Sequence, residues 1–216
     1  MDTDFIYCRH RSPAGIKIEE VSGGEGHSAP VWRAMAWQIY KENGKDGYRD
    51  VTHTESGAPL LYGGNERISA SHAAGLLVVA TLAPVPGADF EVYSPQTALG
   101  VDTEMADRGQ VLRIRERFMS AAELASIPAD DVEANVLAWT VKEAVFKAAL
   151  QPGLDLRDIV ITELPEPAPD SDTRDARFGT ATAPLLSGDT SFRLYSYRHG
   201  SHIVTLAWHP EAAVFV

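Results

Sequence analysis

The sequence contains a single cysteine and no long apolar segment. Cys8 cannot form an internal disulfide and has no neighbours at metal-ligand spacing, so no redox chemistry is indicated. The longest apolar run, residues 75–83, is too short to cross a bilayer. Residues 1–12 lack the basic start and apolar core of a secretory signal peptide. We therefore expect a cytoplasmic protein that does not enter a membrane.

Positive charge is also scarce, since 19 lysines and arginines face 30 aspartates and glutamates, for a formal net charge of −11. Nonspecific binding to nucleic acid or to anionic membrane needs a dominant positive field, so the composition argues against both. Residues 108–117 are a local exception, with four arginines and one glutamate. A charge run of this kind is commonly a solvated helix face. Its position directly after two carboxylates keeps a functional role open.

Hydrophobic residues make up 44% of the chain and charged residues 23%, which is ordinary for a globular protein. The 216 residues fit one large domain or two of about 100 residues each. We divide the chain into an N-terminal half, residues 1–98, and a C-terminal half, residues 99–216. A strand, a His-bearing turn and a second β-rich strand occur in residues 69–84 and again in residues 196–210. This echo favours two similar α/β halves, although two unrelated hairpins would give the same pattern.

Hydrophobic periodicity and turn residues predict a mixture of strands and helices. A capping box at residues 120–123 is expected to open a short helix. Residues 83–96 contain three prolines and are expected to be a loop. The predicted strands span residues 5–8, 16–21, 67–71, 76–82, 97–104, 158–163, 192–197 and 203–208, and the predicted helices span residues 31–40, 108–118 and 131–150.

The predicted helix over residues 131–150 has a carboxylate on an apolar line. Val132, Val136, Trp139, Phe146 and Leu150 recur at helical spacing, and Glu143 falls among them. A carboxylate on a buried face must be paired, protonated or bound to a cation.

Two further carboxylates lie on the predicted strand at residues 97–104, where side-chain alternation puts Asp102 and Glu104 on one face. Packing the helix on this sheet would bring both close to Glu143, and a hard divalent cation such as magnesium would relieve their repulsion. Lys147, one turn beyond Glu143, could meet phosphate oxygens. A simple Glu143–Lys147 helix pair beside an exposed strand end explains the same spacing and stays open.

Four short motifs occur in a fixed order: ISASH at residues 68–72, GVDTE at 100–104, RFMSAAE at 117–123 and WTVKEAVFK at 139–147. The last three resemble the signature of the 4′-phosphopantetheinyl transferases, which combines a G-[VI]-D-x-E strand, an F-[FT]-x-x-E-like segment and a W-x-x-K-E-A-x-x-K helix. The first resembles the I-S-x-S-H segment of the longer, single-chain Sfp-type members. Because the motifs occur together and in order, the resemblance is specific.

The resemblance implies an α+β (α/β) fold of two similar halves related by a pseudo-twofold axis, with the active site at their interface. It also implies Mg²⁺-dependent transfer of phosphopantetheine from coenzyme A to a serine of an apo acyl or peptidyl carrier protein, with release of adenosine 3′,5′-bisphosphate. Since each half would supply what shorter members gain by oligomerising, we expect a monomer. A weakly active homologue that binds carrier protein or coenzyme A is the alternative.

Site residues follow from the motifs position by position. The resemblance implies that Asp102, Glu104 and Glu143 hold magnesium, and that Glu143 or a water it orients accepts the serine proton, with Glu123 as a lesser candidate. The basic run would guide docking of an acidic carrier through Arg113, Arg115 and Arg117. The residues expected to contact coenzyme A are Arg67, Ser71, His72, Lys142 and Lys147.

The chain departs from the family pattern at the nucleotide end. Many Sfp-type members carry G-K-P, whereas residues 57–59 here read G-A-P, and the S-H-S ending becomes S-H-A at Ala73. Arg67 could replace the missing lysine. An unrelated magnesium-dependent phosphoryl-transfer enzyme is disfavoured, because no GxxxxGK[ST] phosphate loop is present.

Overall fold

The computed structural model describes residues 6–11, 16–23, 51–53, 59–61, 67–82, 97–168, 178–186 and 188–212. The helix predicted for residues 31–40 and the loop predicted for residues 83–96 lie outside these ranges.

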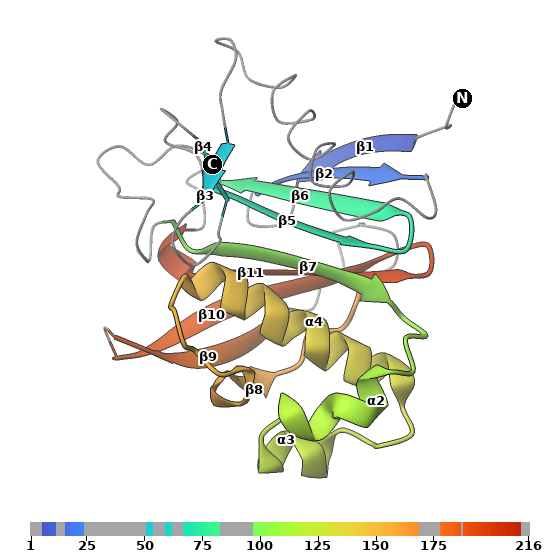
Figure 1. Cartoon of the computed structure of the whole chain (residues 1–216), viewed down its shortest axis with the longest axis vertical. Helices are drawn as coiled ribbons and strands as arrows, with labels where there is room; N and C mark the ends of the chain where they lie inside the picture. Colours follow the sequence, from blue (N-terminus) through green and yellow to red (C-terminus); the bar gives the residue numbers. More distant parts are fainter. Residues whose placement is uncertain are drawn as a thin grey trace.

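The N-terminal strands form one antiparallel sheet in the order β1-β2-β6-β5-β4-β3 (Figure 1). Its central strand β6 is buried along its whole length, as its apolar sequence LLVVATL predicts. The strands are β1 (Ile6–Arg11), β2 (Lys17–Ser22), β3 (Val51–His53), β4 (Pro59–Leu61), β5 (Arg67–Ala73) and β6 (Leu76–Leu82).

The C-terminal strands form a second sheet in the order β7-β11-β10-β9-β8. Helix α4 lies across one face of this sheet, and the other face packs on the N-terminal sheet (Figure 1). The strands are β7 (Leu99–Met105), β8 (Val160–Glu163), β9 (Gly179–Leu185), β10 (Gly188–His199) and β11 (His202–Trp208), and the helical segments are α2 (Val111–Ile114), η2 (Arg115–Arg117), α3 (Ala121–Ser126), α4 (Val132–Ala149), η3 (Leu156–Asp158) and η6 (Pro210–Ala212).

The protein is thus a mixed α/β fold with two sheets and few helices among its described residues, in agreement with the predicted α+β class. Two hydrophobic cores follow from the layers. One lies between α4 and the C-terminal sheet, and the other lies between the two sheets. In the described ranges no helix is both long and apolar enough to span a bilayer.

Both expected hairpins are present, as β5–β6 and β10–β11. The first strand is longer than predicted and continues to Ala73, so His72 lies in the strand and the turn is formed by Ala74 and Gly75. The helix predicted for residues 108–118 is wrong, because the segment divides into the short α2 and η2.

The ends of α4 agree with its sequence signals. Asp131 caps the N-terminus by accepting a hydrogen bond from Ala134 N (3.0 Å), and Leu150 ends the helix in a left-handed conformation with φ of 50°. In its C-terminal half α4 approaches β7 very closely. A Cβ at Gly100 would lie 1.9 Å from the backbone oxygen of Ala144, so this contact requires glycine.

This close approach corrects the predicted apolar line of α4. The helix packs on β7 through a face that includes Val141, Ala144 and Ala148, which are fully buried, whereas Phe146 is 39% exposed. Glu143 lies at the margin of the buried face and is half-buried. The fully buried charge on α4 is its neighbour, Lys142.

Candidate metal and anion site

Asp102 is the centre of the polar contacts between α4 and the two sheets. It lies on β7, which packs against β5, and only 5% of its surface is exposed. Its Oδ1 accepts hydrogen bonds from Ser71 Oγ on β5 and Lys147 Nζ on α4, both at 2.8 Å. Its buried Oδ2 has no hydrogen-bond partner in the described part of the chain. A buried carboxylate oxygen without a donor is open to a cation.

Glu143 lies within electrostatic reach of Asp102 at the contact between α4 and β7. Burial raises the pKa of the Glu143 carboxyl and the charge of Asp102 raises it further, whereas Lys147 and Arg108 lower it. The two carboxylates therefore repel each other at this contact. Glu104, the third predicted ligand, forms an ion pair with Arg108.

The donor chemistry fits a hard divalent cation, because these side chains offer oxygen ligands with excess negative charge. The three carboxylates do not converge into a finished site, since within the described ranges no three His, Cys, Asp or Glu side chains are grouped closely enough to hold a metal. Instead, Asp102 forms an ion pair with Lys147, and Glu104 forms one with Arg108. The metal-ligand assignment therefore stays a prediction.

A buried arginine lies next to this group. Arg67 at the start of β5 is 1% exposed and donates from Nη2 to the backbone oxygen of Lys147 (3.2 Å). Its Nε and Nη1 have no hydrogen-bond partner among the residues described. Burial lowers the pKa of this guanidinium to about 10. A buried cation with unused donors is a strong attraction for an anion or for hydrogen-bond acceptors.

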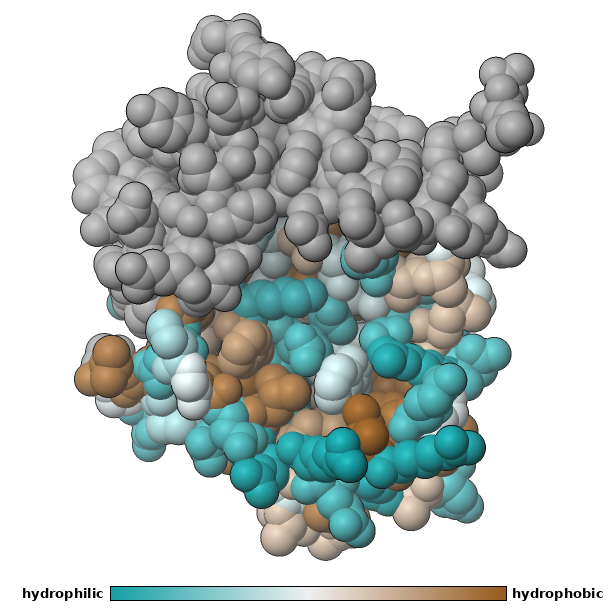
Figure 2. Space-filling model, viewed as in Figure 1, coloured by the Kyte–Doolittle hydropathy of each residue, from teal (hydrophilic) through white to brown (hydrophobic). Residues whose placement is uncertain are grey.

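Arg67 and Lys147 line a cavity of about 380 Å³. Its other walls are mainly apolar, which suits a ligand with both charged and apolar parts. Figure 2 shows apolar and hydrophilic residues side by side on the molecular face that carries α4. The remaining lining residues are Pro59, Ser69, Ala70, Phe146, Leu150, Gln151, Pro152 and Gly153.

His72 points to a different place from Ser71, because neighbouring side chains of β5 alternate between the two faces of the sheet. Ser71 contacts Asp102, whereas His72 is exposed and lines an open hollow of about 540 Å³. Glu104, Arg108 and Gln110 also line this hollow. We call the charged residues Arg67, Asp102, Glu104, Arg108, Glu143 and Lys147 the open cluster.

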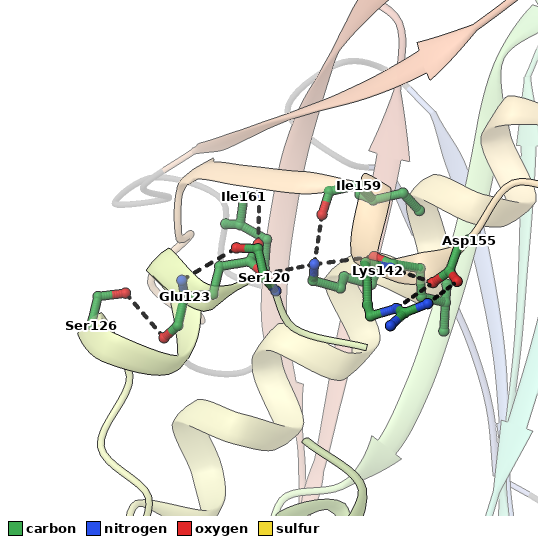
Figure 3. A network of polar contacts seen from close by, with 9 residues as sticks. Ser120, Glu123, Ser126, Lys142, Asp155, Ile159 and Ile161 are labelled. Carbon is green, nitrogen blue, oxygen red and sulfur yellow. Dashed lines mark hydrogen bonds and ion pairs between the residues drawn. The ribbon is translucent and has the colours of Figure 1, made fainter. Parts of the chain in front are cut away.

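Glu123 and Lys142 form a separate network that is fully satisfied (Figure 3). Glu123 Oε2 accepts from Lys142 Nζ and from Ser120 N, both at 2.7 Å, while Oε1 accepts from Ile161 N at 2.8 Å. Lys142 Nζ also donates to the backbone oxygens of Ile159 (2.5 Å) and Leu156 (3.1 Å). We call this network the closed cluster.

The closed cluster joins α3, α4, η3 and β8, and it includes the capping box that the sequence predicts. Its two charged side chains were predicted to be a catalytic base and a coenzyme contact. Both are buried, Lys142 completely, and every charged oxygen and nitrogen is already bonded within the protein. The catalytic role of Glu123 and the coenzyme contact of Lys142 stay predictions, which this set of internal bonds does not favour.

The three arginines predicted to guide docking differ in their surroundings. Arg113 and Arg117 are exposed. Arg115 is buried, and its Nη2 donates to the backbone oxygens of Ile127 (2.6 Å) and Leu124 (3.4 Å). Arg115 therefore holds the chain around α3, and two of the three predicted side chains remain at the surface.

Sequence reasoning missed the role of two serines that join the halves. Ser69 Oγ accepts a hydrogen bond from Val101 N (3.0 Å), and Ser71 donates to Asp102. The signal was present, because alternation along β5 places both serines on one strand face. What the sequence could not show is that this face meets β7.

Comparison with known proteins places the chain in a family of transferases. The model of the 4′-phosphopantetheinyl transferase superfamily matches residues 98–207, which include α4 and the C-terminal sheet up to Ala207 in β11. The chain belongs to this superfamily, and phosphopantetheinyl transfer is therefore its class of activity. No curated protein matches the chain.

Proposed function

We propose that the protein transfers 4′-phosphopantetheine from coenzyme A to a serine of an apo carrier protein, with Mg²⁺ as the metal and adenosine 3′,5′-bisphosphate as the second product. The observation that carries the proposal is the buried Oδ2 of Asp102, which has no hydrogen-bond partner among the described residues and lies near the charges of Glu143 and Lys147. It lies within the segment that the family model matches. The cavity lined by Arg67 and Lys147 adds a place for an anionic cosubstrate.

Asp102, Glu104 and Glu143 would hold the metal, as their oxygen donors and mutual repulsion support. When bound, magnesium would neutralise the pyrophosphate and polarise the phosphoryl group that is attacked. Ser71 orients Asp102 through its hydrogen bond, which leaves Oδ2 as the oxygen available to a cation.

Lys147 would bind phosphate oxygens of coenzyme A. Its Nζ is anchored by Asp102 Oδ1 and by the backbone oxygen of Val101 (3.0 Å), so it is held beside a proposed metal ligand. Arg67 would meet the nucleotide end in the cavity, in place of the lysine that residues 57–59 lack. Positioning and charge neutralisation are the main tasks of a protein in this type of transfer.

Ser71 and His72 stay predicted contacts of the 3′-phosphate. His72 is exposed at the open hollow, where a phosphate can reach it, whereas Ser71 would have to release Asp102. Glu143, or a water that it orients, would accept the proton of the carrier serine, because its raised pKa favours proton uptake. We assign Glu123 and Lys142 a structural role, which their closed set of bonds supports.

We also propose that the chain is a monomeric, cytoplasmic, Sfp-type enzyme with two similar halves that meet near residue 98. Matching strand orders support this idea. The N-terminal sheet contains the series β2-β6-β5-β4-β3, and the C-terminal sheet has β7-β11-β10-β9-β8, so successive strands occupy corresponding places. Asp102 and Ser71 would then meet at the interface between the halves.

Exposed Arg113 and Arg117 would receive an acidic carrier protein on a molecule that is otherwise strongly acidic. Reversing both charges to glutamate should raise the apparent KM for carrier protein at low salt, with a smaller effect at high salt. An unchanged KM at low salt would remove these residues from docking.

Incubating the protein with coenzyme A, Mg²⁺ and an apo carrier protein tests the function. Mass spectrometry should find phosphopantetheine on the carrier serine. Glu143→Gln should abolish this product while the protein stays folded, and the matched change Glu133→Gln on the same helix should not. Absence of product with several unrelated carriers would overturn the proposed function, and a fully active Glu143→Gln variant would remove Glu143 from the site.

A further inference from the structure

Each of the two carboxylates on β7 has its own positively charged partner. Lys147 Nζ lies 2.8 Å from Asp102 Oδ1, and Arg108 forms an ion pair with Glu104 four residues before it. Both cations are within electrostatic reach of Glu143. Two protein cations, Lys147 and Arg108, therefore act on three carboxylates, whereas the third cation of the open cluster, Arg67, donates to a backbone oxygen.

The two cations are held differently. Lys147 is fixed by a second acceptor, the backbone oxygen of Val101. The Arg108 guanidinium has Glu104 as its one hydrogen-bond partner within the residues described, and it is partly exposed on the open hollow beside His72 and Gln110. The Arg108 side chain is 39% exposed and the Glu104 side chain 17%. Because Arg108 lacks the second acceptor that fixes Lys147, it can leave its carboxylate at a smaller cost than Lys147 can.

A divalent cation and Arg108 compete for Glu104. Magnesium binds carboxylate oxygens in a strict octahedral arrangement at short distance. A guanidinium bonded to Oε1 blocks one oxygen, and its positive charge repels an arriving cation. Metal binding to Glu104 is therefore opposed by Arg108 in this position and is favoured when Arg108 turns away into the hollow.

We propose that Arg108 is an exchangeable counter-ion that holds Glu104 until a divalent cation displaces it. The inference rests on the proposed function, because it takes Glu104 as a metal ligand. It deepens that function by making metal affinity weak in the protein alone. Further oxygen ligands from a bound pyrophosphate would then be needed for firm retention, so metal and coenzyme binding would be coupled.

The experiment measures binding of Mn²⁺, which shares the oxygen preference of Mg²⁺, from the electron paramagnetic resonance signal of the free ion. Wild type, Arg108→Gln and the matched control Arg113→Gln are compared at low salt. Both variants lose one positive charge, but Arg113 is exposed on α2 and, among the residues that the structure describes, forms no hydrogen bond or ion pair with the three carboxylates. Arg108→Gln should bind Mn²⁺ at least about 5-fold more tightly, whereas Arg113→Gln should change affinity by less than about 2-fold.

Two further variants separate exchange from altered folding. Arg108→Lys keeps the charge and should keep the weak affinity, and in a Glu104→Gln background Arg108→Gln should bring no gain. Thermal melting shows that each variant is folded. If Arg108→Gln binds Mn²⁺ no more tightly than Arg113→Gln, or if neither wild type nor Arg108→Gln binds it at all, the proposal is overturned.

The measurement contains neither coenzyme A nor carrier protein, so its outcome is independent of transfer activity. A gain in Mn²⁺ affinity in a protein that transfers nothing would support exchange and overturn the proposed function. Active transfer without a gain in Mn²⁺ affinity would support the proposed function and overturn the exchange of Arg108.

Discussion

Neighbouring residues of α4 belong to two very different groups of charges. Lys142 lies in the closed cluster, where it binds Glu123 and two backbone oxygens. Glu143 lies in the open cluster, where the charge of Asp102 disfavours its ionised form. Lys147 and Arg108 favour the ionised form, although each forms its ion pair with another carboxylate. Helix α4 thus carries Lys142, whose ion pair with Glu123 is completely bonded, next to Glu143, for which the described residues show no ion pair.

The difference lies in how completely the polar atoms are bonded. Both oxygens of Glu123 have donors, whereas Asp102 Oδ2 and two nitrogens of Arg67 lack partners within the described residues. A fully bonded buried pair stabilises one packing of the chain. Buried atoms without partners cost stability, and they persist where a ligand completes them. We therefore propose a structural role for the closed cluster and a functional role for the open one.

The largest expected effect is on activity in the open cluster. Asp102→Asn should lower kcat/KM for transfer by more than about 100-fold, because it removes the charge of the central metal ligand. Melting temperature should stay close to that of wild type, since the substitution also removes repulsion with Glu143. Asp130→Asn, at an exposed position before α4, is the control and should be fully active. An active Asp102→Asn enzyme would break the assignment.

The next largest effect is on the stability of the closed cluster. Lys142→Met should lower the free energy of unfolding by about 3–5 kcal/mol, because it leaves the buried Glu123 carboxylate without its cation. Urea denaturation measures the change. Adding Glu123→Gln should restore part of the loss. A loss below about 1 kcal/mol would show that the closed cluster does not have the structural role proposed for it.

Loss of a buried cation from the open cluster should not lower the free energy of unfolding, in contrast to its loss from the closed cluster. Arg67→Met should leave the free energy of unfolding unchanged or raise it by about 1 kcal/mol, since an incompletely bonded guanidinium gives way to an apolar side chain of similar size. Affinity for coenzyme A, followed by calorimetry, should fall about 10-fold. Strong destabilisation together with normal coenzyme affinity would make Arg67 structural.

The smallest effect is a dependence of stability on pH. Because the pKa of Glu143 is raised in the folded protein, folding disfavours its ionised form; this cost grows as pH rises above the unfolded value of about 4.3 and vanishes below it. Glu143→Gln should therefore raise the melting temperature of metal-free protein near neutral pH and have less effect at about pH 4. A gain that is larger in acid would contradict the repulsion between Glu143 and Asp102.

The sequence predicts local features of this fold well and the rotation of α4 poorly. The caps at Asp131 and Ser120, the two hairpins and the carboxylate-bearing strand follow from short-range signals. The apolar line through Phe146 is wrong because the contact of Gly100 with Ala144 fixes which helix face is buried. The spacing of apolar residues along a helix cannot show which side of that helix a strand from elsewhere in the chain will approach.

The same limit applies to the site. Motifs predict which residue types the site needs, and Asp102, Ser71 and Lys147 do meet. The motifs also treat Lys142 and Glu143 alike, although the first is bonded within the closed cluster. Likewise, the helix predicted for residues 108–118 breaks where Arg115 turns inward to the carbonyl groups of Leu124 and Ile127. Such choices depend on contacts between segments that are distant in the chain.

Calorimetric titration of coenzyme A, with and without Mg²⁺, into wild type and Asp102→Asn tests the functional assignment of the open cluster most directly. We expect Mg²⁺ to strengthen binding to wild type by about 10-fold or more and to leave binding to Asp102→Asn unchanged. Equal affinities for wild type with and without Mg²⁺, or an undiminished Mg²⁺ effect in Asp102→Asn, would contradict it.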